Sequence, residues 1–309
     1  MRTARIGSLE VSVVGVGCNN FGRALDRDAS AAVVHAALDQ GVTYFDTARV
    51  YGEGLSESFL GAALGARRDE VIVGTKFGRV PQHPDDDGAD AAAIARAVET
   101  SLSELGTDYI DLYQLHFPDP DTPLVETLGA LQGLVDEGKV REIGCSNFTV
   151  ELLGEAQTAA TEHGLGGFVS DQVHYSMLHR QPEVDGLGAF CVSRGVALLP
   201  YYPLANGLLT GKTRRGEQPQ GRLGMQRYRR FLTDENFDVV ERVGAFGLER
   251  GLSPVEVALG WLLTRPAVPA VTPGATRPEQ VAANVGAADW RPTAHDLAIL
   301  DRILDPGAG

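Results

Sequence analysis

Short apolar runs alternate with longer amphipathic segments along most of the chain. Eight runs have the length and composition of buried strands, at 13–17, 43–46, 71–75, 109–116, 140–144, 168–172, 196–201 and 267–271. Helical patterns lie between and after them, at 28–40, 55–65, 90–105, 123–137, 149–162, 183–194, 234–250, 278–286 and 294–304. Strands that alternate with helices predict βαβ units and a parallel sheet. Eight such repeats are the number that closes a (β/α)8 barrel.

An open, doubly wound α/β sheet is the competing architecture. Such a sheet usually carries the glycine-rich G-x-G-x-x-G fingerprint between its first strand and first helix. The first strand here runs into GVGCNNFG, where Gly15, Gly17 and Gly22 do not have that spacing. We therefore predict one (β/α)8 barrel domain over residues 1–309.

Two helix starts and one long irregular stretch can be read directly. Thr149 is a candidate N-cap, and Ser253-Pro254 opens another helix with proline at a tolerated position. The stretch at about 204–233 is glycine-rich and carries one acid, Glu217, against Lys212, Arg214, Arg215, Arg222, Arg227, Arg229 and Arg230. Long loops inside compact domains are usually functional or disordered. In a chain of net acidic charge, this local basic charge predicts that an anion is held nearby, and the alternative is a solvated, flexible insertion.

Composition narrows the class of protein. Of 309 residues, 43% are hydrophobic, which is enough for a large core, and the net charge is −14. An acidic surface repels nucleic acids and anionic lipids, so neither is an expected partner. We find no signal-peptide pattern and no apolar run long enough to span a bilayer. The scattered Cys18, Cys145 and Cys191 argue against a disulfide framework, so we expect a cytoplasmic protein.

Ionisable side chains follow three neighbouring strands, where a (β/α)8 barrel has its active site. Asp46 ends the second strand, and Tyr51 follows five residues later. Lys76 ends the third strand and His116 ends the fourth. Taken singly, these residues have structural explanations, such as a cap, a loop anchor, a surface lysine and a core histidine. Their joint placement favours a catalytic site.

The four residue types suit the reduction of a carbonyl group. The hydride must come from a cofactor, because no side chain donates one. The proton needs a weak acid, and Tyr51 is the candidate, although phenol has a pKa of about 10. Lys76, held by Asp46, would lower that pKa because an ammonium stabilises phenolate. His116 would hydrogen-bond the carbonyl oxygen.

With these motifs the sequence resembles the aldo-keto reductase superfamily, from Gly15 to Asn284. The family's catalytic tetrad maps onto Asp46, Tyr51, Lys76 and His116. The resemblance implies an oxidoreductase that reduces an aldehyde or ketone with a nicotinamide cofactor.

The resemblance also implies a nicotinamide site. The string GCSNF at 144–148 is similar to the family's G-x-S-N segment, so Ser146 and Asn147 would bind the carboxamide. Gln172 would bind the same amide, and the nicotinamide ring would stack on Tyr201.

The family's phosphate sites have counterparts further along the chain. The pyrophosphate loop maps onto Leu204, Gly207 and Leu209, through their backbone N–H groups, and onto Lys212 through its charge. The adenosine-phosphate site maps onto Gly274, Thr276, Arg277, Gln280 and Asn284. A guanidinium suits a 2′-phosphate, so Arg277 predicts NADPH (NADP+) rather than NADH as the cofactor.

The chain departs from the family's pattern at three places. Tyr202 stands where the family often has serine, and Ala283 stands where relatives often have an acid. The segment 205–233 does not align with the family.

Substrate choice would come from the loops at the barrel mouth. The candidates are Phe21, Arg49, Phe77, Phe117 and Tyr202. The acidic loop at 83–88 lacks converging ligands, so we expect a solvated loop and no metal.

Two other functions stay open. One is an NAD(P)-dependent dehydrogenase of a sugar or pyridoxal-like alcohol, the same chemistry in reverse. The other is a non-catalytic regulatory subunit that senses nicotinamide redox state, a role for which Tyr51 and Lys76 would not be needed. A Schiff-base aldolase would use a strand-end lysine but would not explain Ser146, Asn147, Gln172 or Tyr201. Substrate, direction and oligomeric state are left open.

Overall fold

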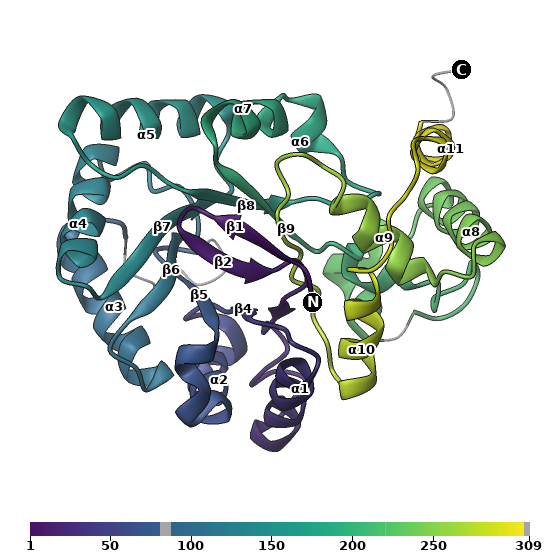
Figure 1. Cartoon of the computed structure of the whole chain (residues 1–309), viewed down its shortest axis with the longest axis horizontal. Coiled ribbons are helices and arrows are strands. Elements are labelled where there is room, and N and C mark those ends of the chain that lie inside the picture. The colour runs from purple at the N-terminus through teal and green to yellow at the C-terminus, as the bar shows by residue number, and fades with distance from the viewer. Residues whose placement is uncertain (81–87, 220, 306–309) are drawn as a thin grey trace.

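A computed structural model describes residues 1–80, 88–219 and 221–305. The first elements are strands β1 (Thr3–Ile6) and β2 (Leu9–Ser12), which pair antiparallel. This hairpin crosses in front of the central strands in Figure 1. Its Ile6, Leu9 and Val11 pack against inward-facing side chains such as Tyr44 and Leu112. The hairpin therefore closes one end of the central sheet with apolar contacts.

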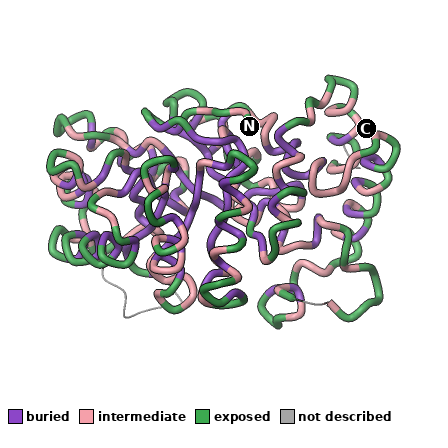
Figure 2. Tube along the Cα trace, turned by 60° about the horizontal axis from the view of Figure 1, so that its bottom comes forward, coloured by how far each residue is buried: buried purple, intermediate pink, exposed green. Residues whose placement is uncertain are grey.

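Seven parallel strands follow, and each pairs with the next along the chain. They are β3 (Val16–Gly17), β4 (Tyr44–Asp46), β5 (Ile72–Phe77), β6 (Ile110–Leu115), β7 (Val140–Ser146), β8 (Ser170–His174) and β9 (Ala197–Tyr201). Most of their residues are buried on both faces, as is usual for parallel strands. Figure 2 shows this as a buried centre within an exposed periphery.

The segment 267–274 takes the eighth strand position without forming a regular strand. Leu198 N donates to Ala267 O at 2.8 Å on the β9 side, and Val271 N donates to Val13 O at 3.0 Å on the β3 side. The segment forms bridges to both Val14 and Gly17. It closes the sheet into the predicted (β/α)8 barrel.

Close approach at this seam requires glycine. A Cβ on Gly17 would lie 2.6 Å from the carbonyl oxygen of Thr272, and one on Gly15 would lie 2.6 Å from that of Tyr44. Real Cβ atoms essentially never come so close. The glycines of the GVG segment therefore serve closure of the barrel.

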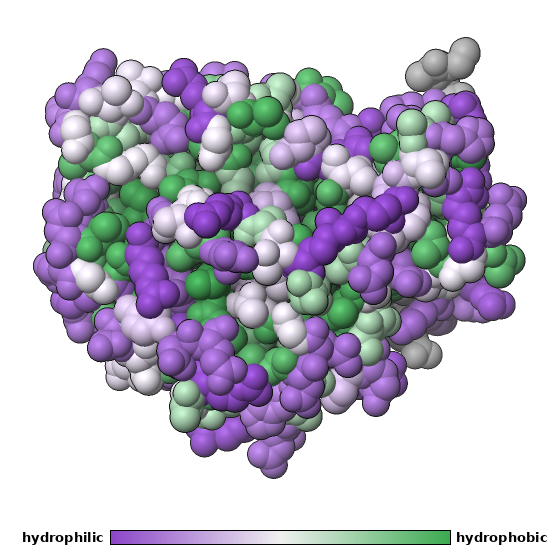
Figure 3. All heavy atoms as spheres, viewed as in Figure 1, coloured by the Kyte–Doolittle hydropathy of each residue, from purple (hydrophilic) through white to green (hydrophobic). Residues whose placement is uncertain are grey.

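Helices surround the sheet in chain order (Figure 1). They are α1 (Arg27–Asp39), α2 (Leu55–Leu64), α3 (Ala91–Leu105), α4 (Leu124–Asp136), α5 (Val150–His163), α6 (Gln181–Val184), α7 (Leu187–Arg194), α8 (Asp234–Glu249), α9 (Pro254–Leu262), α10 (Pro278–Gly286) and α11 (Ala294–Leu304). One hydrophobic core cluster runs from Val13 to Leu300. Figure 3 shows hydrophobic and hydrophilic residues interspersed on the face that carries the hairpin.

The predicted elements agree with the structure except in a few places. The hairpin β1–β2 was not predicted, and the helix expected at 183–194 is two helices separated by Gly186, whose φ is +81°. The expected N-caps are present, because Thr149 accepts from Leu152 N and Ser253 forms a capping box with Glu256.

Two loops were predicted from the sequence, at 204–233 and at 83–88. The stretch 204–233 contains three short 3-10 helices, η3 (Ala205–Thr210), η4 (Gly221–Gly224) and η5 (Gln226–Phe231). The acidic loop at 83–88 lies outside the described residues except for Gly88. In the part of the chain that the structure describes, no cluster of three or more potential metal ligands is found. The helices described there include none that is long and apolar enough to cross a membrane.

Candidate active site

A buried ion pair lies at the carboxyl ends of β4 and β5. Lys76 Nζ lies 2.9 and 2.8 Å from the two carboxylate oxygens of Asp46, and it donates to the Thr47 carbonyl oxygen at 2.7 Å. Lys76 is 1% exposed and Asp46 is 5% exposed. Burial alone would lower the pKa of Lys76, but Asp46 and Tyr51 together raise it above its usual value. Lys76 is therefore an ammonium at neutral pH.

Tyr51 stands directly over this pair. It begins η1 (Tyr51–Gly54), and its ring centroid lies 5.1 Å from Lys76 Nζ. Burial raises the pKa of Tyr51 above its usual value, and the Lys76 ammonium opposes that rise. The lysine thus acts in the predicted direction, but desolvation is the larger effect, and Tyr51 is protonated at neutral pH.

His116 completes the predicted tetrad. Its ring meets the Tyr51 ring edge-on, with centroids 6.0 Å apart, and stacks on Phe117 at 5.3 Å. The backbone N–H of His116 donates to Phe77 O at 2.9 Å, which fixes the residue just beyond β6. The structure therefore brings Asp46, Tyr51, Lys76 and His116 together at one end of the barrel.

The residues predicted to hold a nicotinamide amide extend the same network. Gln172 Nε2 donates to Asp46 Oδ1 at 2.9 Å, and Ser146 Oγ donates to the Gln172 carbonyl oxygen at 2.7 Å. Asn147 Nδ2 donates to Ser146 Oγ at 3.0 Å, while Asn147 Oδ1 accepts from the Tyr201 hydroxyl at 2.9 Å. Asn147 has a φ of +63°, an uncommon conformation that is often found at functional sites.

Two histidines that sequence reasoning did not single out support the Tyr201 ring. The rings of His174 and Tyr201 stack at 5.5 Å with an interplanar angle of 11°, and His179 stacks on His174 at 3.9 Å. Burial, helped by the neighbouring His179, lowers the pKa of His174 to about 3. The stack is therefore neutral at His174 over the working range of most enzymes.

A cavity of about 480 Å³ begins at Asp46 and Tyr51 and runs toward α10. Eight of the predicted cofactor residues line it: Tyr201, Leu204, Gly207, Lys212, Gly274, Thr276, Gln280 and Asn284. Thr276 N and Thr276 Oγ1 both donate to Gln280 Oε1, at 2.7 and 3.1 Å. Two residues of the predicted tetrad, Asp46 and Tyr51, thus line the same space as the predicted phosphate sites.

The other five predicted cofactor residues do not line this cavity: Ser146, Asn147 and Gln172, which belong to the network around Asp46, and Leu209 and Arg277. Leu209 is fully buried in the core, and its backbone N–H, like that of Gly207, already donates to the Leu204 carbonyl oxygen. Arg277 is exposed at the start of α10, beside Thr276.

Of the predicted substrate residues, Tyr202 lines the cavity and Phe117 stacks on His116. Phe21 and Phe77 are instead at most 1% exposed and belong to the core, where Phe77 stacks on Tyr113 at 4.6 Å. Arg49 does not line the cavity either.

Several lining residues were not predicted individually as site residues. They are Asn19, Asn20, Arg23, Asn206, Thr210, Arg222 and Met225. Arg222 Nη2 donates to Asn19 Oδ1 at 3.0 Å and to Asn20 Oδ1 at 3.1 Å. These contacts join the 204–233 loop to the turn after β3, so the loop passes over the cavity. The basic composition of the loop was the only sequence signal for this.

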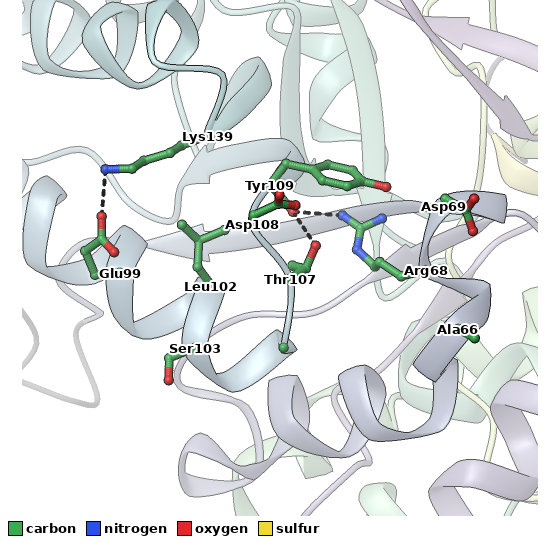
Figure 4. A pocket seen from close by; sticks show the side chains of 11 residues that line it. Ala66, Arg68, Asp69, Glu99, Leu102, Ser103, Thr107, Asp108, Tyr109 and Lys139 are labelled. Carbon is green, nitrogen blue, oxygen red and sulfur yellow. Dashed lines mark hydrogen bonds and ion pairs between the residues drawn. The ribbon is translucent and has the colours of Figure 1, made fainter.

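A second, more open groove of about 920 Å³ lies at the amino ends of the strands (Figure 4). Its Lys139 pairs with Glu99 at 2.8 Å, and its Arg68 pairs with Asp111 at 2.7 Å. This end of a (β/α)8 barrel is associated with stability rather than catalysis. Paired charges at that end make it a poor candidate for an active site.

Comparison with known proteins gives a consistent picture. The family model described as "Aldo/keto reductase family" matches residues 13–305. An aldo-keto reductase of Bacillus subtilis, YhdN, is 32% identical over 313 residues, which cover 96% of this chain and 91% of that protein. A probable voltage-gated potassium channel subunit beta of Oryza sativa is 32% identical over 280 residues, covering 88% of this chain and 85% of that protein. A protein of the same description from Arabidopsis thaliana is 31% identical over 304 residues, covering 96% and 92%.

Proposed function

The chain belongs to the aldo/keto reductase family of oxidoreductases, and from that premise we propose that it is an NADPH-dependent reductase of aldehydes or ketones. The observation that carries the proposal is the position of Tyr51 over the buried ion pair of Lys76 and Asp46. A proton donor beside a fixed ammonium, at the carboxyl ends of barrel strands, suits carbonyl reduction.

The cavity fits a dinucleotide cofactor. Both polar side-chain atoms of Asn206, which lines the cavity, are buried and have no hydrogen-bond partner among the described residues. Buried polar atoms normally have partners, so a polar ligand is expected beside Asn206. Ser146, Asn147, Gln172 and Tyr201 would hold a nicotinamide.

The remaining predicted cofactor residues would hold the phosphates and adenosine. They are Leu204, Lys212, Gly274, Thr276, Arg277, Gln280 and Asn284. Gly207 and Leu209 are excepted, because their backbone N–H groups already donate to the Leu204 carbonyl oxygen. When bound, the cofactor supplies the hydride for the reaction. Arg277, exposed at the start of α10, favours a 2′-phosphate and hence NADPH over NADH.

The chain's own residues carry the proton. Tyr51, protonated at neutral pH, donates to the carbonyl oxygen, and Lys76 stabilises the phenolate that remains. Asp46 holds Lys76 in place and keeps it charged. His116, edge-on to Tyr51, orients the carbonyl oxygen through a hydrogen bond. In reverse, the same groups would serve an alcohol dehydrogenase.

A second candidate is a non-catalytic subunit that binds the cofactor and associates with a membrane channel. The relatives described as probable potassium channel beta subunits favour it. The arrangement of Asp46, Tyr51 and Lys76 supports the enzyme, because binding alone does not call for a proton donor on a buried ion pair.

Substitution of the proton donor tests the proposal. Tyr51→Phe keeps the ring over Lys76 but removes the hydroxyl, so carbonyl-dependent oxidation of NADPH should fall about a hundredfold or more. NADPH binding, measured by fluorescence titration, should stay within about twofold of wild type, since the ring is retained.

Tyr109→Phe is the matched control, because Tyr109 lies in the groove at the other end of the barrel. It should leave turnover unchanged. Near-normal turnover by Tyr51→Phe would remove Tyr51 from the role of acid.

A further inference from the structure

The proposed proton donor stands on an unusual turn of the backbone. Tyr51 begins η1, and the three residues between it and α2, Gly52, Glu53 and Gly54, have φ angles of +61°, +57° and +92°. This left-handed conformation is uncommon for a glutamate. It persists only where the surrounding structure determines it. The contacts on either side of the turn must therefore fix the turn, and Tyr51 with it.

On one side, the first turn of α2 is fixed through Ser56. The Ser56 hydroxyl donates to the Cys18 carbonyl oxygen at 2.9 Å, and its oxygen lies 2.8 Å from the Thr47 hydroxyl, which is then the donor. Cys18 N donates to the Asp46 carbonyl oxygen at 2.8 Å. The Thr47 carbonyl oxygen accepts from Lys76 Nζ at 2.7 Å. Ser56 is thus separated by a single residue from each member of the buried ion pair.

Glu57, the next residue of α2, binds the strand that carries the lysine. Glu57 Oε1 accepts from the Thr75 hydroxyl at 2.6 Å, and Thr75 directly precedes Lys76 in β5. Because side chains alternate along a strand, this bond is made on the face of β5 opposite to Lys76. Ser56, Glu57 and Thr75 are all 0% exposed. A buried carboxylate costs free energy unless hydrogen bonds compensate it.

Attachment of a helix to the barrel does not by itself call for buried polar groups. The buried residues of α5 are Leu153, Ala156 and Ala160, which are all apolar. In α2, by contrast, the buried residues of the first turn are Ser56 and Glu57, and the apolar ones come later in the helix. The polar contacts of α2 are therefore concentrated at the end that follows Tyr51.

From this juxtaposition we propose that Ser56 and Glu57 are positioning residues, which fix the Tyr51 hydroxyl relative to Lys76 and so set the rate of proton donation. The inference rests on the proposed function and adds to it a support outside the cavity, which neither residue lines. A misplacement of about 1 Å can cost about a hundredfold in rate. Loss of these bonds therefore slows the reaction without weakening the binding of NADPH.

Removal of single hydroxyl groups tests the proposal. Ser56→Ala removes both bonds of Ser56, and Thr75→Val removes the bond to Glu57 with little change of shape. The assay measures oxidation of NADPH with 4-nitrobenzaldehyde, or with another aldehyde that wild type reduces. In both variants kcat per bound NADPH should fall about tenfold or more. KM for the aldehyde and Kd for NADPH should stay within about twofold of wild type.

Ser58→Ala is the matched control. Ser58 lies in the same helix, and its hydroxyl donates to the Leu55 carbonyl oxygen within that helix. The control should keep the kcat of wild type. Expression of kcat per bound NADPH counts only folded sites, so a variant that is merely less stable shows no loss on this scale.

A double variant gives a readout that a merely structural role would not move. If Ser56 acts through the Tyr51 hydroxyl, its substitution has nothing left to disturb once that hydroxyl is gone. Ser56→Ala combined with Tyr51→Phe should therefore turn over as fast as Tyr51→Phe alone. Losses that multiply in the double variant would overturn the proposal, because Ser56 would then act through another group.

The remaining outcomes separate this proposal from the proposed function. Unchanged kcat per bound NADPH in Ser56→Ala and Thr75→Val would overturn the positioning role and leave the reductase standing. A loss that lies in Kd for NADPH rather than in kcat would also overturn it. Near-normal turnover by Tyr51→Phe, or no NADPH oxidation with any carbonyl tested, would instead overturn the proposed function.

Discussion

At the scale of single residues, the site depends on buried charges that compensate one another. Lys76 and Asp46 are nearly inaccessible to water, and removal of one partner would leave an uncompensated buried charge. Tyr51 shows the same balance. Burial raises the pKa of its hydroxyl, and the Lys76 ammonium opposes that rise.

Asp171, on the outer side of β8, tests whether burial raises the pKa of a carboxyl group in this protein. It is fully buried, burial raises its pKa to about 7, and Oδ2 has no partner among the described residues. The pKa of Asp171 is thus higher in the folded protein than in the unfolded chain, where it is about 3.9. The stability that Asp171 contributes is therefore fully present below about pH 3.9 and is lost as pH rises through about 7. Asp171→Asn removes this loss. The variant should gain stability relative to wild type between about pH 4 and pH 8, by up to about 4 kcal/mol.

Urea unfolding of both proteins at several pH values measures this difference. A gap between variant and wild type that does not change with pH would show that Asp171 titrates in the native state as it does in the unfolded chain.

At the scale of elements, the local sequence pattern predicted those strands, helices and strand ends that depend on neighbouring residues in the chain. Alternation of apolar runs with helical segments located the seven parallel strands and the segment 267–271, which takes the eighth position without forming a regular strand, and the strand ends located Asp46, Lys76 and His116. The hairpin β1–β2 was not identified, because two four-residue strands carry too short an alternation to stand out. The contact of Arg222 with Asn19 joins residues 203 positions apart, and no local pattern encodes which residues barrel closure brings together.

Helix α9, the second helix after the 204–233 loop, offers a test at this scale. The Ser253 side chain caps α9 and Glu256 completes the capping box. Ser253→Ala leaves the N–H of Glu256 without that acceptor, so the free energy of unfolding should fall by about 1 kcal/mol. Thermal or urea denaturation measures the change.

Ser103→Ala is the control, since Ser103 is an exposed interior residue of α3. It should be neutral or slightly stabilising. Equal effects of the two substitutions would mean that the capping box does not stabilise α9.

At the scale of the whole molecule, the two ends of the barrel differ in the residues that they carry. The hairpin packs over one end of the central sheet, and ion pairs such as those of Arg68 and Lys139 line the open groove at the amino ends of the strands. The carboxyl ends collect the ionisable residues, and the 204–233 loop adds arginines over the cavity. A chain with a net charge of −14 thus carries an excess of basic residues around the cavity proposed to hold an anionic cofactor.

We propose that this cavity binds NADPH and that the bound NADPH reduces a carbonyl group. Titration of the purified wild-type protein with NADPH and with NADH, followed by an assay of NADPH oxidation against a panel of aldehydes and ketones, tests it most directly. The account predicts tighter binding of NADPH than of NADH and oxidation that requires a carbonyl compound. Tight NADPH binding without turnover of any carbonyl would contradict the enzyme and support the regulatory subunit, and failure to bind either nucleotide would contradict the site itself.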